Sequence, residues 1–403
     1  MKTKVAVLFG GKSVEHEVSV ISAIQAIMAM DKEKYEIIPV YLTKENDMYI
    51  GPDVGDIAAY KDIKGLLARS QRVVAVREDG RVRLVQYPHK TFGGMKPVDV
   101  DIAFPIVHGT NVEDGALQGF IKTLGIPFVG CDVTSSAICM DKLVSKVVVK
   151  EAGVPVLGAK VYTLADYAEM EAMMDDAEKV FGYPVIVKPV NLGSSVGISV
   201  AADRGELTEA FDDAFRYASK VLVEHAISKL REINCSVLGD ENEAIASECE
   251  EPISSDRILS YEDKYVNGGG GKKTGGAKGS GSKGAGMANL SRIIPAELSA
   301  EKREEIRELA VKAFKALGCN GVARIDFMID EESGNLYFNE INSIPGSLAF
   351  YLWEPVGVPY SELLDRMIEL ALKRARIEDS LTFTFDTNIL ANANLGGSKG
   401  SKK

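Results

Sequence analysis

Cysteines and long apolar runs are scarce in this sequence of 403 residues, and its 47 lysines and arginines are outnumbered by 58 aspartates and glutamates. Its 5 cysteines are an odd number without a short repeated spacing, so they fit neither a disulfide framework nor a zinc site. A net charge of -11 argues against nucleic acid as a partner, because phosphate backbones require a basic surface. No apolar run is long enough to span a membrane, and Val5–Phe9 is too short for a signal peptide. We therefore expect a cytoplasmic protein with reduced thiols and no membrane partner.

The sequence has enough length for two or three domains with cores of their own, and its first part reads as a Rossmann-like α/β domain. A buried strand, Val5–Phe9, ends in Gly10-Gly11 and is followed by a helical pattern. The string Gly-Gly-Lys-Ser is similar to a phosphate-binding P-loop, but Ala6 stands where that motif needs its first glycine. A later strand, predicted over Val98–Val107, leads into a loop that begins at His108. Ligands bind in such loops in open α/β sheets, although His108 could equally be an ordinary loop residue.

A β-hairpin is predicted near the C-terminal third, where two apolar-rich runs, Gly321–Ile329 and Leu336–Asn342, flank an acidic turn. Strand side chains alternate between faces, so Arg324 and Asp326 share one face, as do Glu340 and Asn342. If these faces coincide, three oxygen-bearing side chains converge beside a guanidinium. Oxygen ligands at that density suit Mg²⁺, which takes further ligands from phosphates. The alternative is a solvated outer face of charges.

Phosphate binding is indicated by a strand, Tyr183–Pro189, that carries Lys188 at its exit and leads into a Gly/Ser loop. The loop Gly193–Gly197 contains Ser194 and Ser195, and its backbone N–H groups and hydroxyls could surround phosphate oxygens. Lys142 could supply a second mobile positive charge. The alternative is that the Gly/Ser cluster only turns the chain.

Two acidic residues and a glycine-rich segment complete the candidate nucleotide site. Glu224, at the end of a predicted strand, and Glu232 could accept hydrogen bonds from adenine or ribose, or could be surface charges. Residues 267–286 are mostly Gly with Lys, Ser, Thr and Ala, and cannot bury enough surface to offset their ordering entropy. That segment is either an inert spacer or a lid over a phosphate-rich site. After the hairpin, the turn at Gly346 could direct backbone N–H groups toward a developing oxyanion.

In their order and spacing these motifs resemble the D-alanine–D-alanine ligases of the ATP-grasp superfamily over about residues 1–376. The resemblance is carried by short motifs along the chain: Gly10-Gly11-x-Ser13-x-Glu15, His108-Gly-x-x-x-Glu113-Asp114-Gly115, Met140-Asp141-Lys142, Lys188-Pro189, Gly193-Ser194-Ser195-Val196-Gly197, Lys264-Tyr265, Arg324-Ile-Asp326 and Glu340-Ile-Asn342-x-x-Pro345-Gly346. It implies that ATP phosphorylates the carboxylate of one D-alanine and that the amine of a second D-alanine attacks the acyl phosphate. The product would serve peptidoglycan precursor synthesis.

By the same resemblance, individual residues are assigned expected roles. Catalytic roles fall to Glu15, Ser194, Tyr265, Arg324 and Gly346. Substrate contacts fall to His108, Ser347 and Leu348. ATP contacts fall to Lys142, Lys188, Ser194, Ser195, Glu224, Ile227, Glu232 and Lys264. Metal ligation falls to Asp326, Glu340 and Asn342, which would hold two Mg²⁺ ions or Mn²⁺.

The resemblance also implies an organisation and a set of partners. The expected fold is α/β ATP-grasp, with a Rossmann-like domain over residues 1–130 and two α+β domains, 131–227 and 228–376, that sandwich ATP. A tail over residues 377–403 is expected to be partly frayed. The partners are the small molecules ATP and D-alanine, and the protein is expected to be a homodimer.

Other functions remain open on the sequence alone. A D-Ala–D-Ser ligase is hard to distinguish, because one added hydroxyl discriminates weakly. A D-Ala–D-lactate ligase is less favoured, because such relatives usually lack the tyrosine matched by Tyr265. A different ATP-grasp carboxylate–amine ligase and a non-catalytic nucleotide-binding protein are the remaining alternatives. One departure from the family concerns Ser347-Leu348, which follow Gly346 directly, where many relatives have a few more residues.

Overall fold

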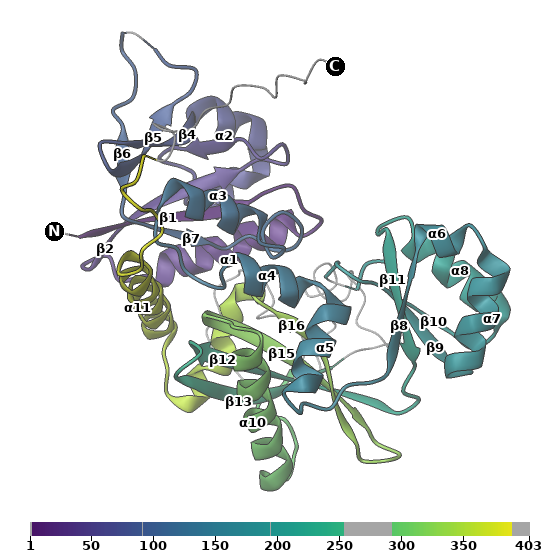
Figure 1. Ribbon diagram of the computed structural model, residues 1–403. Coiled ribbons are helices and arrows are strands. Elements are labelled where there is room, and N and C mark those ends of the chain that lie inside the picture. Colours follow the sequence, from purple (N-terminus) through teal and green to yellow (C-terminus); the bar gives the residue numbers. More distant parts are fainter. Residues whose placement is uncertain (1, 91, 194, 254–291, 389–403) are drawn as a thin grey trace, which may run out of the picture.

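The computed structural model describes residues 2–90, 92–193, 195–253 and 292–388. Within these ranges the strands form three separate sheets, with seven, four and five strands, and helices cover them (Figure 1). The α/β class expected from the sequence is therefore confirmed.

The N-terminal unit is built on a mixed sheet with the strand order β6-β5-β4-β3-β2-β1-β7. Its elements are β1 (Thr3–Gly10), α1 (His16–Ala29), β2 (Tyr35–Leu42), β3 (Met48–Ile50), α2 (Ile63–Arg69), β4 (Gln71–Glu78), β5 (Arg81–Gln86), β6 (Val98–Val100), β7 (Ile102–Pro105) and α3 (Ala116–Leu124). Strand β1 pairs in parallel with β2 and β7, so the loops after β1 and β7 meet at one edge of the sheet.

The single strand predicted over Val98–Val107 was wrong in this respect, because the structure has two strands there. Asp101 separates them: its backbone N–H donates to Lys4 O (3.0 Å), and its Oδ2 accepts from Lys4 N (2.8 Å). Strand β6 then pairs with β5, and β7 with β1.

The middle unit contains a four-stranded sheet in the order β10-β9-β11-β8, packed against its own helices. Its elements are β8 (Ala159–Thr163), α6 (Leu164–Tyr167), α7 (Met170–Phe181), β9 (Val185–Pro189), β10 (Ser199–Ala201), α8 (Arg204–Ala214) and β11 (Lys220–His225). The two helices before it, α4 (Val133–Met140) and α5 (Lys142–Glu151), pack instead in the core of the C-terminal sheet, to which Cys139 and Val149 belong. Residues of β8–β11, α7 and α8 form an apolar core of their own. Figure 1 shows this sheet and α6–α8 standing apart from the rest of the chain.

The C-terminal unit has an antiparallel sheet in the order β14-β13-β12-β15-β16. Its elements are β12 (Leu230–Gly239), β13 (Ala244–Pro252), β14 (Arg292–Ile293), α10 (Ala300–Ala316), β15 (Gly321–Asp330), β16 (Leu336–Asn342), the 3-10 segments η4 (Gly346–Leu352) and η5 (Glu354–Val356), and α11 (Tyr360–Asp379). The predicted hairpin is confirmed as β15 and β16. One face of β15, with Ala323, Ile325 and Phe327, packs with Phe314 of α10 in one apolar core.

Helix α11 packs into the core of the N-terminal unit, although it is the last helix described. Its residues Leu363, Leu364 and Met367 belong to the same buried cluster as Val5 and Val7 of β1. Figure 1 shows α11 in yellow below the N-terminal sheet. The helix therefore joins the N-terminal unit to the C-terminal one.

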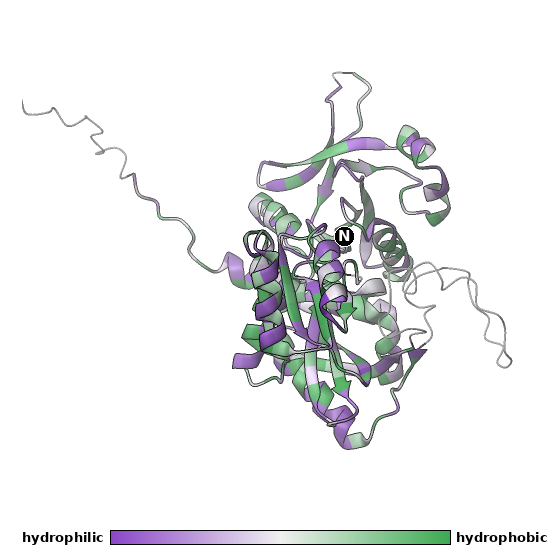
Figure 2. Cartoon of the chain, turned by 90° about the vertical axis from the view of Figure 1, so that its right-hand side faces the viewer, coloured by the Kyte–Doolittle hydropathy of each residue, from purple (hydrophilic) through white to green (hydrophobic). Residues whose placement is uncertain are grey.

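Hydropathy follows this layering. Figure 2 shows strands that are largely green, and surrounding helices that carry purple segments. Among the helices described, none combines the length and the apolar character that crossing a membrane requires.

Truncating Phe314 tests the C-terminal core. The side chain is fully buried between α10 and the sheet, so Phe314→Ala should lower the free energy of unfolding by about 3–5 kcal/mol. The urea midpoint measures this loss. Phe92→Ala is the matched control, because Phe92 is 91% exposed and its truncation should change the midpoint by less than about 0.5 kcal/mol in equivalent free energy. Equal midpoints for the two variants would contradict the packing described.

Candidate functional site

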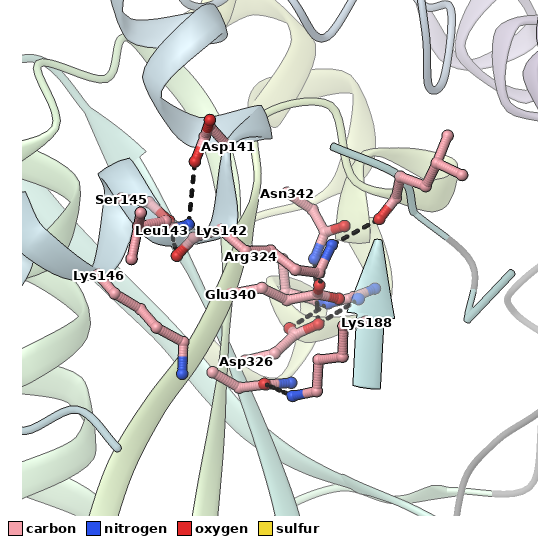
Figure 3. A network of polar contacts seen from close by, with 12 residues as sticks. Asp141, Lys142, Leu143, Ser145, Lys146, Lys188, Arg324, Asp326, Glu340 and Asn342 are labelled. Carbon is pink, nitrogen blue, oxygen red and sulfur yellow. Dashed lines mark hydrogen bonds and ion pairs between the residues drawn. The ribbon is translucent and has the colours of Figure 1, made fainter. Parts of the chain in front are cut away.

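The β15–β16 hairpin brings the predicted metal-ligating residues together. Asp326 stands directly opposite Glu340, and Arg324 opposite Asn342, so all four side chains lie on one face of the hairpin. Figure 3 shows them converging between the two strands and the α5 N-terminus. The alternation on which the sequence prediction relied is therefore correct, and a bulge follows only after Asp326.

The carboxylates of this cluster are held by basic and amide groups. Arg324 binds Asp326 through two hydrogen bonds, Nε to Oδ1 and a terminal nitrogen to Oδ2, both 2.7 Å. Asn342 Nδ2 also donates to Asp326 Oδ2 (3.0 Å), and Lys142 Nζ lies 3.2 Å from Glu340 Oε2. Burial alone would lower the pKa of Arg324, but Asp326 outweighs it and raises that pKa. The guanidinium is therefore permanently charged and fixed in place.

The donor set of this cluster fits a divalent cation that is completed by phosphate. Within the ranges described, no three His, Cys, Asp or Glu side chains gather into a metal cluster. Asp326 and Glu340 offer two carboxylates, and Asn342 offers an amide oxygen in place of a third carboxylate. Hard oxygen donors in this small number suit Mg²⁺, which keeps waters and binds through one or two carboxylates plus substrate phosphates.

Lys142 is placed by the start of helix α5. Asp141 caps that helix by accepting hydrogen bonds from Leu143 N (3.0 Å) and Val144 N (2.9 Å). Lys142 is then the first helical residue, and its Nζ donates to Leu192 O (2.5 Å). The ammonium therefore lies between Glu340 and the loop after β9, where the sequence predicted phosphate contacts.

A buried ion triplet lies one turn further along α5. Glu224 of β11 is fully buried, and its Oε2 accepts from Lys146 Nζ (2.5 Å) while its Oε1 accepts from Lys188 Nζ of β9. Lys188 Nζ also donates to Asn339 Oδ1 of β16 (3.1 Å), which ties the two smaller sheets together. Burial raises the pKa of Glu224, but the two ammonium groups outweigh it and lower that pKa to about 2. Burial lowers the pKa of Lys146.

A cavity of about 210 Å³ opens beside this triplet, between the four-stranded and five-stranded sheets. Its lining includes Ile186, Lys188, Glu224, Ile227, Leu230 and Met328. Glu232 is the cross-strand partner of Met328, so its side chain lies on the same face of the sheet as the cavity. The lining combines apolar side chains with charged ones, Lys188 and Glu224 beside the triplet and Lys229 and Glu331 near the hairpin turn, which suits an aromatic base attached to a polar chain.

The N-terminal unit contributes Glu15 and His108 at the carboxyl edge of its sheet. Glu15 is buried at the start of α1. A Cβ on Gly109 would lie 2.9 Å from Glu15 Oε2, and one on Gly193 would lie 3.2 Å from it, so both loops approach this carboxylate closely. His108 is buried, and burial lowers its pKa. The structure thus gathers Glu15 and His108 with a loop of the middle unit.

The segment after β16 is clamped at Ile344 by the loop that follows β7. His108 Nδ1 donates to Ile344 O (2.8 Å), and Ile344 N donates to Glu113 Oε1 (3.1 Å). Glu113 Oε2 also accepts from Gly109 N (2.7 Å). Burial first and Glu15 second raise the pKa of Glu113 to about 8, against the effect of these two N–H donors. The N-terminal unit therefore sets the position of the turn that follows β16.

That turn has an unusual backbone. Ser347, Leu348 and Ala349 are consecutive non-glycine residues with φ near +52°, within a short left-handed helical turn that follows Gly346. Such a conformation costs about 1–2 kcal/mol per residue, so surrounding contacts must maintain it. Ser347 and Leu348 are both about 1% exposed, and Ser347 Oγ is buried without a hydrogen-bond partner among the residues described. The turn therefore offers a fixed hydroxyl for a polar ligand group.

Several predicted residues cannot be compared with the structure. Ser194, Lys264, Tyr265 and the segment 267–286 lie outside the described residues. Ser195 is described in the loop between β9 and β10, with φ of 59°. The roles expected for all of these residues stay predictions.

Some residues of the site were missed in the sequence analysis. Lys146 lies four residues after Lys142, so helical spacing alone places both on one face of α5. Asn339 and Ser22 reach the site through contacts between units, which no local pattern in the sequence reveals. Glu113 belonged to a recognised motif, but only the fold shows that it clamps Ile344.

The middle and C-terminal units, which enclose a cavity whose lining includes Lys188 and Glu224, form an ATP-grasp fold, and solved structures share the architecture. The structure of a D-alanine–D-alanine ligase from Coxiella burnetii matches with a TM-score of 0.75 at 29% identity, covering 94% of this chain and 96% of that one. A D-Ala:D-Ser ligase from Enterococcus faecalis matches with a TM-score of 0.74 at 32% identity, covering 92% of this chain and 100% of that one.

Sequence comparison identifies the family. The D-ala D-ala ligase N-terminus family matches residues 4–131, and the D-ala D-ala ligase C-terminus family matches residues 148–278 and 282–369. The D-alanine–D-alanine ligase of Caldicellulosiruptor bescii is 40% identical over 394 residues, 95% of this chain and 99% of that protein. That of a Thermoanaerobacter species is 42% identical over 383 residues, 92% of this chain and 97% of that protein. The chain belongs to the D-alanine–D-alanine ligase family.

Replacing Glu224 tests the buried ion triplet. Glu224→Gln leaves two ammonium groups buried beside a neutral amide, so stability near neutral pH should fall by about 3–5 kcal/mol. The folded pKa of about 2 lies below the ordinary 4.5, so the carboxylate contributes stability above pH 4.5 that is lost as the pH falls toward 2. Urea midpoints measured across this range should therefore converge for parent and variant.

The control for this test is Glu171→Gln, because the Glu171 side chain is 82% exposed in an ion pair with Arg204. That variant should lose less than about 1 kcal/mol at any pH. If the urea midpoints of the parent and Glu224→Gln differ by the same amount from neutral to acid pH, the lowered pKa of Glu224 is contradicted.

Proposed function

We propose that the protein is an ATP-dependent ligase that joins two D-alanines into D-alanyl-D-alanine for peptidoglycan precursor synthesis. The observation that carries the proposal is the convergence, on one face of the hairpin, of Arg324, Asp326, Glu340 and Asn342 with Lys142. Family membership supports the reaction, since the curated relatives described above are D-alanine–D-alanine ligases.

The nucleotide is proposed to bind between the two smaller sheets. The cavity beside Ile227 and Glu224 suits the adenine and ribose, and Glu232 lies on the same face of the sheet. Lys142 and Lys188, with the loop carrying Ser194 and Ser195, are proposed to hold the phosphates, together with Lys264. Lysine suits this task because its ammonium is a compact charge on a flexible stem.

Divalent cations are proposed to bind at Asp326, Glu340 and Asn342, as two Mg²⁺ ions or, alternatively, Mn²⁺. A divalent cation held there would neutralise phosphate charge and polarise the phosphoryl group that is transferred. Arg324 and Lys142 already balance both carboxylates, so the chain itself preserves their spacing. Asp326, Glu340 and Asn342 would therefore offer a cation a prearranged set of oxygen donors.

The first D-alanine is proposed to place its ammonium at Glu15, with Ser194 and Tyr265 completing that contact and His108 nearby. Glu15 is buried, and Gly109 and Gly193 approach its carboxylate so closely that an added Cβ would lie 2.9 Å and 3.2 Å from Oε2. The carboxylate of this D-alanine attacks the γ-phosphorus of ATP; the bond to the β,γ-bridging oxygen breaks and ADP leaves.

The second D-alanine is proposed to bind at Ser347 and Leu348. Its amine attacks the acyl carbon, and a tetrahedral intermediate forms whose oxygen faces Arg324 and the backbone N–H of Gly346. Collapse of the intermediate breaks the bond to phosphate, and the amine loses its proton as the peptide bond forms. The buried position of the turn keeps water from competing for the acyl phosphate.

We also propose the organisation expected from the sequence, with domains over residues 1–130, 131–227 and 228–376, a tail over 377–403, and a cytoplasmic homodimer. The separate apolar core of β8–β11, α7 and α8 supports the division of that part of 131–227, whereas α4 and α5 share the core of the C-terminal sheet. All five cysteines are buried and free, which suits a reducing compartment. Sedimentation of the purified chain measures the oligomeric state, and a monomer would contradict the homodimer.

Glu340→Gln tests the metal–phosphate role of the hairpin. Loss of one carboxylate should reduce ATP-dependent phosphate release with D-alanine by on the order of 10³-fold, because metal stabilisation is worth several kcal/mol. The control is Glu332→Gln, on the turn of the same hairpin, where the carboxylate is 56% exposed. This control should keep the parent rate. If Glu340→Gln releases phosphate at the parent rate and keeps the parent's unfolding midpoint, Glu340 is not a metal ligand.

An amino-acid panel tests the substrates directly. The parent chain is incubated with ATP, Mg²⁺ and D-alanine alone or with D-serine, D-lactate or L-alanine, and ADP release is followed while products are identified by mass. D-alanyl-D-alanine should dominate. A mixed D-Ala–D-Ser product in excess would move the chain to the alternative ligase class, and ADP release without any dipeptide would contradict the proposed function.

A further inference from the structure

Ser22 is a buried serine of α1 that lies outside the residues assigned to the reaction. It is 1% exposed, and its hydroxyl faces two elements at once. Its Oγ lies 2.9 Å from His108 Nε2, in the loop after β7, and 2.9 Å from Ser347 N, in the left-handed turn. One hydroxyl therefore connects two residues that the proposed function places at the substrates.

The carbonyl oxygen of Ile344 fixes the direction of the hydrogen bonds that lead through His108 and Ser22 to Ser347 N. A carbonyl oxygen can only accept, so His108 Nδ1 must carry the proton that it donates to Ile344 O (2.8 Å). His108 is buried, which favours its neutral form, so Nε2 is the unprotonated nitrogen and accepts from the Ser22 hydroxyl. The Ser22 oxygen is then left to accept from Ser347 N–H.

The turn needs such a restraint because its backbone is unfavourable. Ser347, Leu348 and Ala349 all have positive φ, and non-glycine residues hold that conformation only when their surroundings fix it. Leu348 N donates to Pro345 O (2.8 Å) within the turn, whereas Ser347 N is held from outside, by Ser22. Losing this acceptor would leave a buried N–H unpaired in the middle of a strained segment.

We propose that Ser22 is a positioning residue for the second substrate: its hydroxyl, oriented by His108, holds the backbone of Ser347 so that Ser347 Oγ stays directed at that substrate. The inference rests on the proposed function, because it takes Ser347 as a substrate contact. Ser22 itself touches no reacting atom. Its effect is expected on the acceptor D-alanine and not on ATP.

Ser22→Ala removes the hydroxyl while keeping the helix. The dependence of rate on D-alanine concentration yields separate KM values for the first and second D-alanine. The second should rise about tenfold, as expected for one hydrogen bond, while the KM values for ATP and the first D-alanine change less than about twofold. Phosphate released per dipeptide should also rise, since a misplaced acceptor leaves the acyl phosphate to water.

Ser19→Ala is the matched control. Ser19 is fully buried in the same helix, accepts from Gly10 N (2.8 Å) and donates to Ile106 O (2.6 Å), but it does not contact the turn. This variant should lose comparable stability without changing the ratio of the two KM values. If both variants change the ratio equally, or neither does, the positioning role is overturned.

A measurement without turnover separates this inference from the proposed function. Amide hydrogen exchange of the segment 343–352 should be about tenfold faster in Ser22→Ala than in Ser19→Ala, and equal exchange would overturn the inference even in an inactive chain. Failure of the proposed function appears instead as absence of dipeptide from the parent. Should Ser22→Ala not fold, Ser22→Cys keeps the side-chain volume, weakens both hydrogen bonds and carries the same expected and overturning results.

Discussion

Asp326 and Glu340 face each other across neighbouring strands, and two carboxylates placed so close repel each other unless cations accompany them. The structure supplies those cations from its own chain: a guanidinium two residues along the same strand, and the first lysine of helix α5. The acidic pair can therefore be built before any ligand arrives. Every other part of the proposed site is arranged around this balance of charge.

A second group of balanced charges joins the four-stranded and five-stranded sheets that enclose the cavity. Glu224 neutralises Lys146 and Lys188, and Lys188 also reaches Asn339 on the hairpin. A fully buried carboxylate with two ammonium groups is stabilising only while all three members are present. The same lysine therefore serves the structure, by linking two sheets, and stands where phosphate binding is proposed.

How much of this was predictable depends on whether the determining contacts are local. The hairpin follows from alternation and turn residues, so the shared face of Arg324, Asp326, Glu340 and Asn342 could be predicted from the sequence. The break at Asp101 could not, because it depends on a pairing with Lys4, far away in the chain. The clamp at Ile344 and the role of Ser22 likewise depend on how separate units meet. Burial of Lys146 could have been suspected only from its spacing to Lys142.

Helix α11 carries a consequence for how the chain acquires its structure. Its leucines complete the apolar core of a sheet whose first strand begins at Thr3, so the two ends of the described chain share one interior. During synthesis β1 emerges well before α11, so the apolar face of the sheet that α11 covers stays open until α11 has been made. The core of the N-terminal sheet is therefore complete only after the C-terminal sheet, which lies between β1 and α11 in the chain, has also been made.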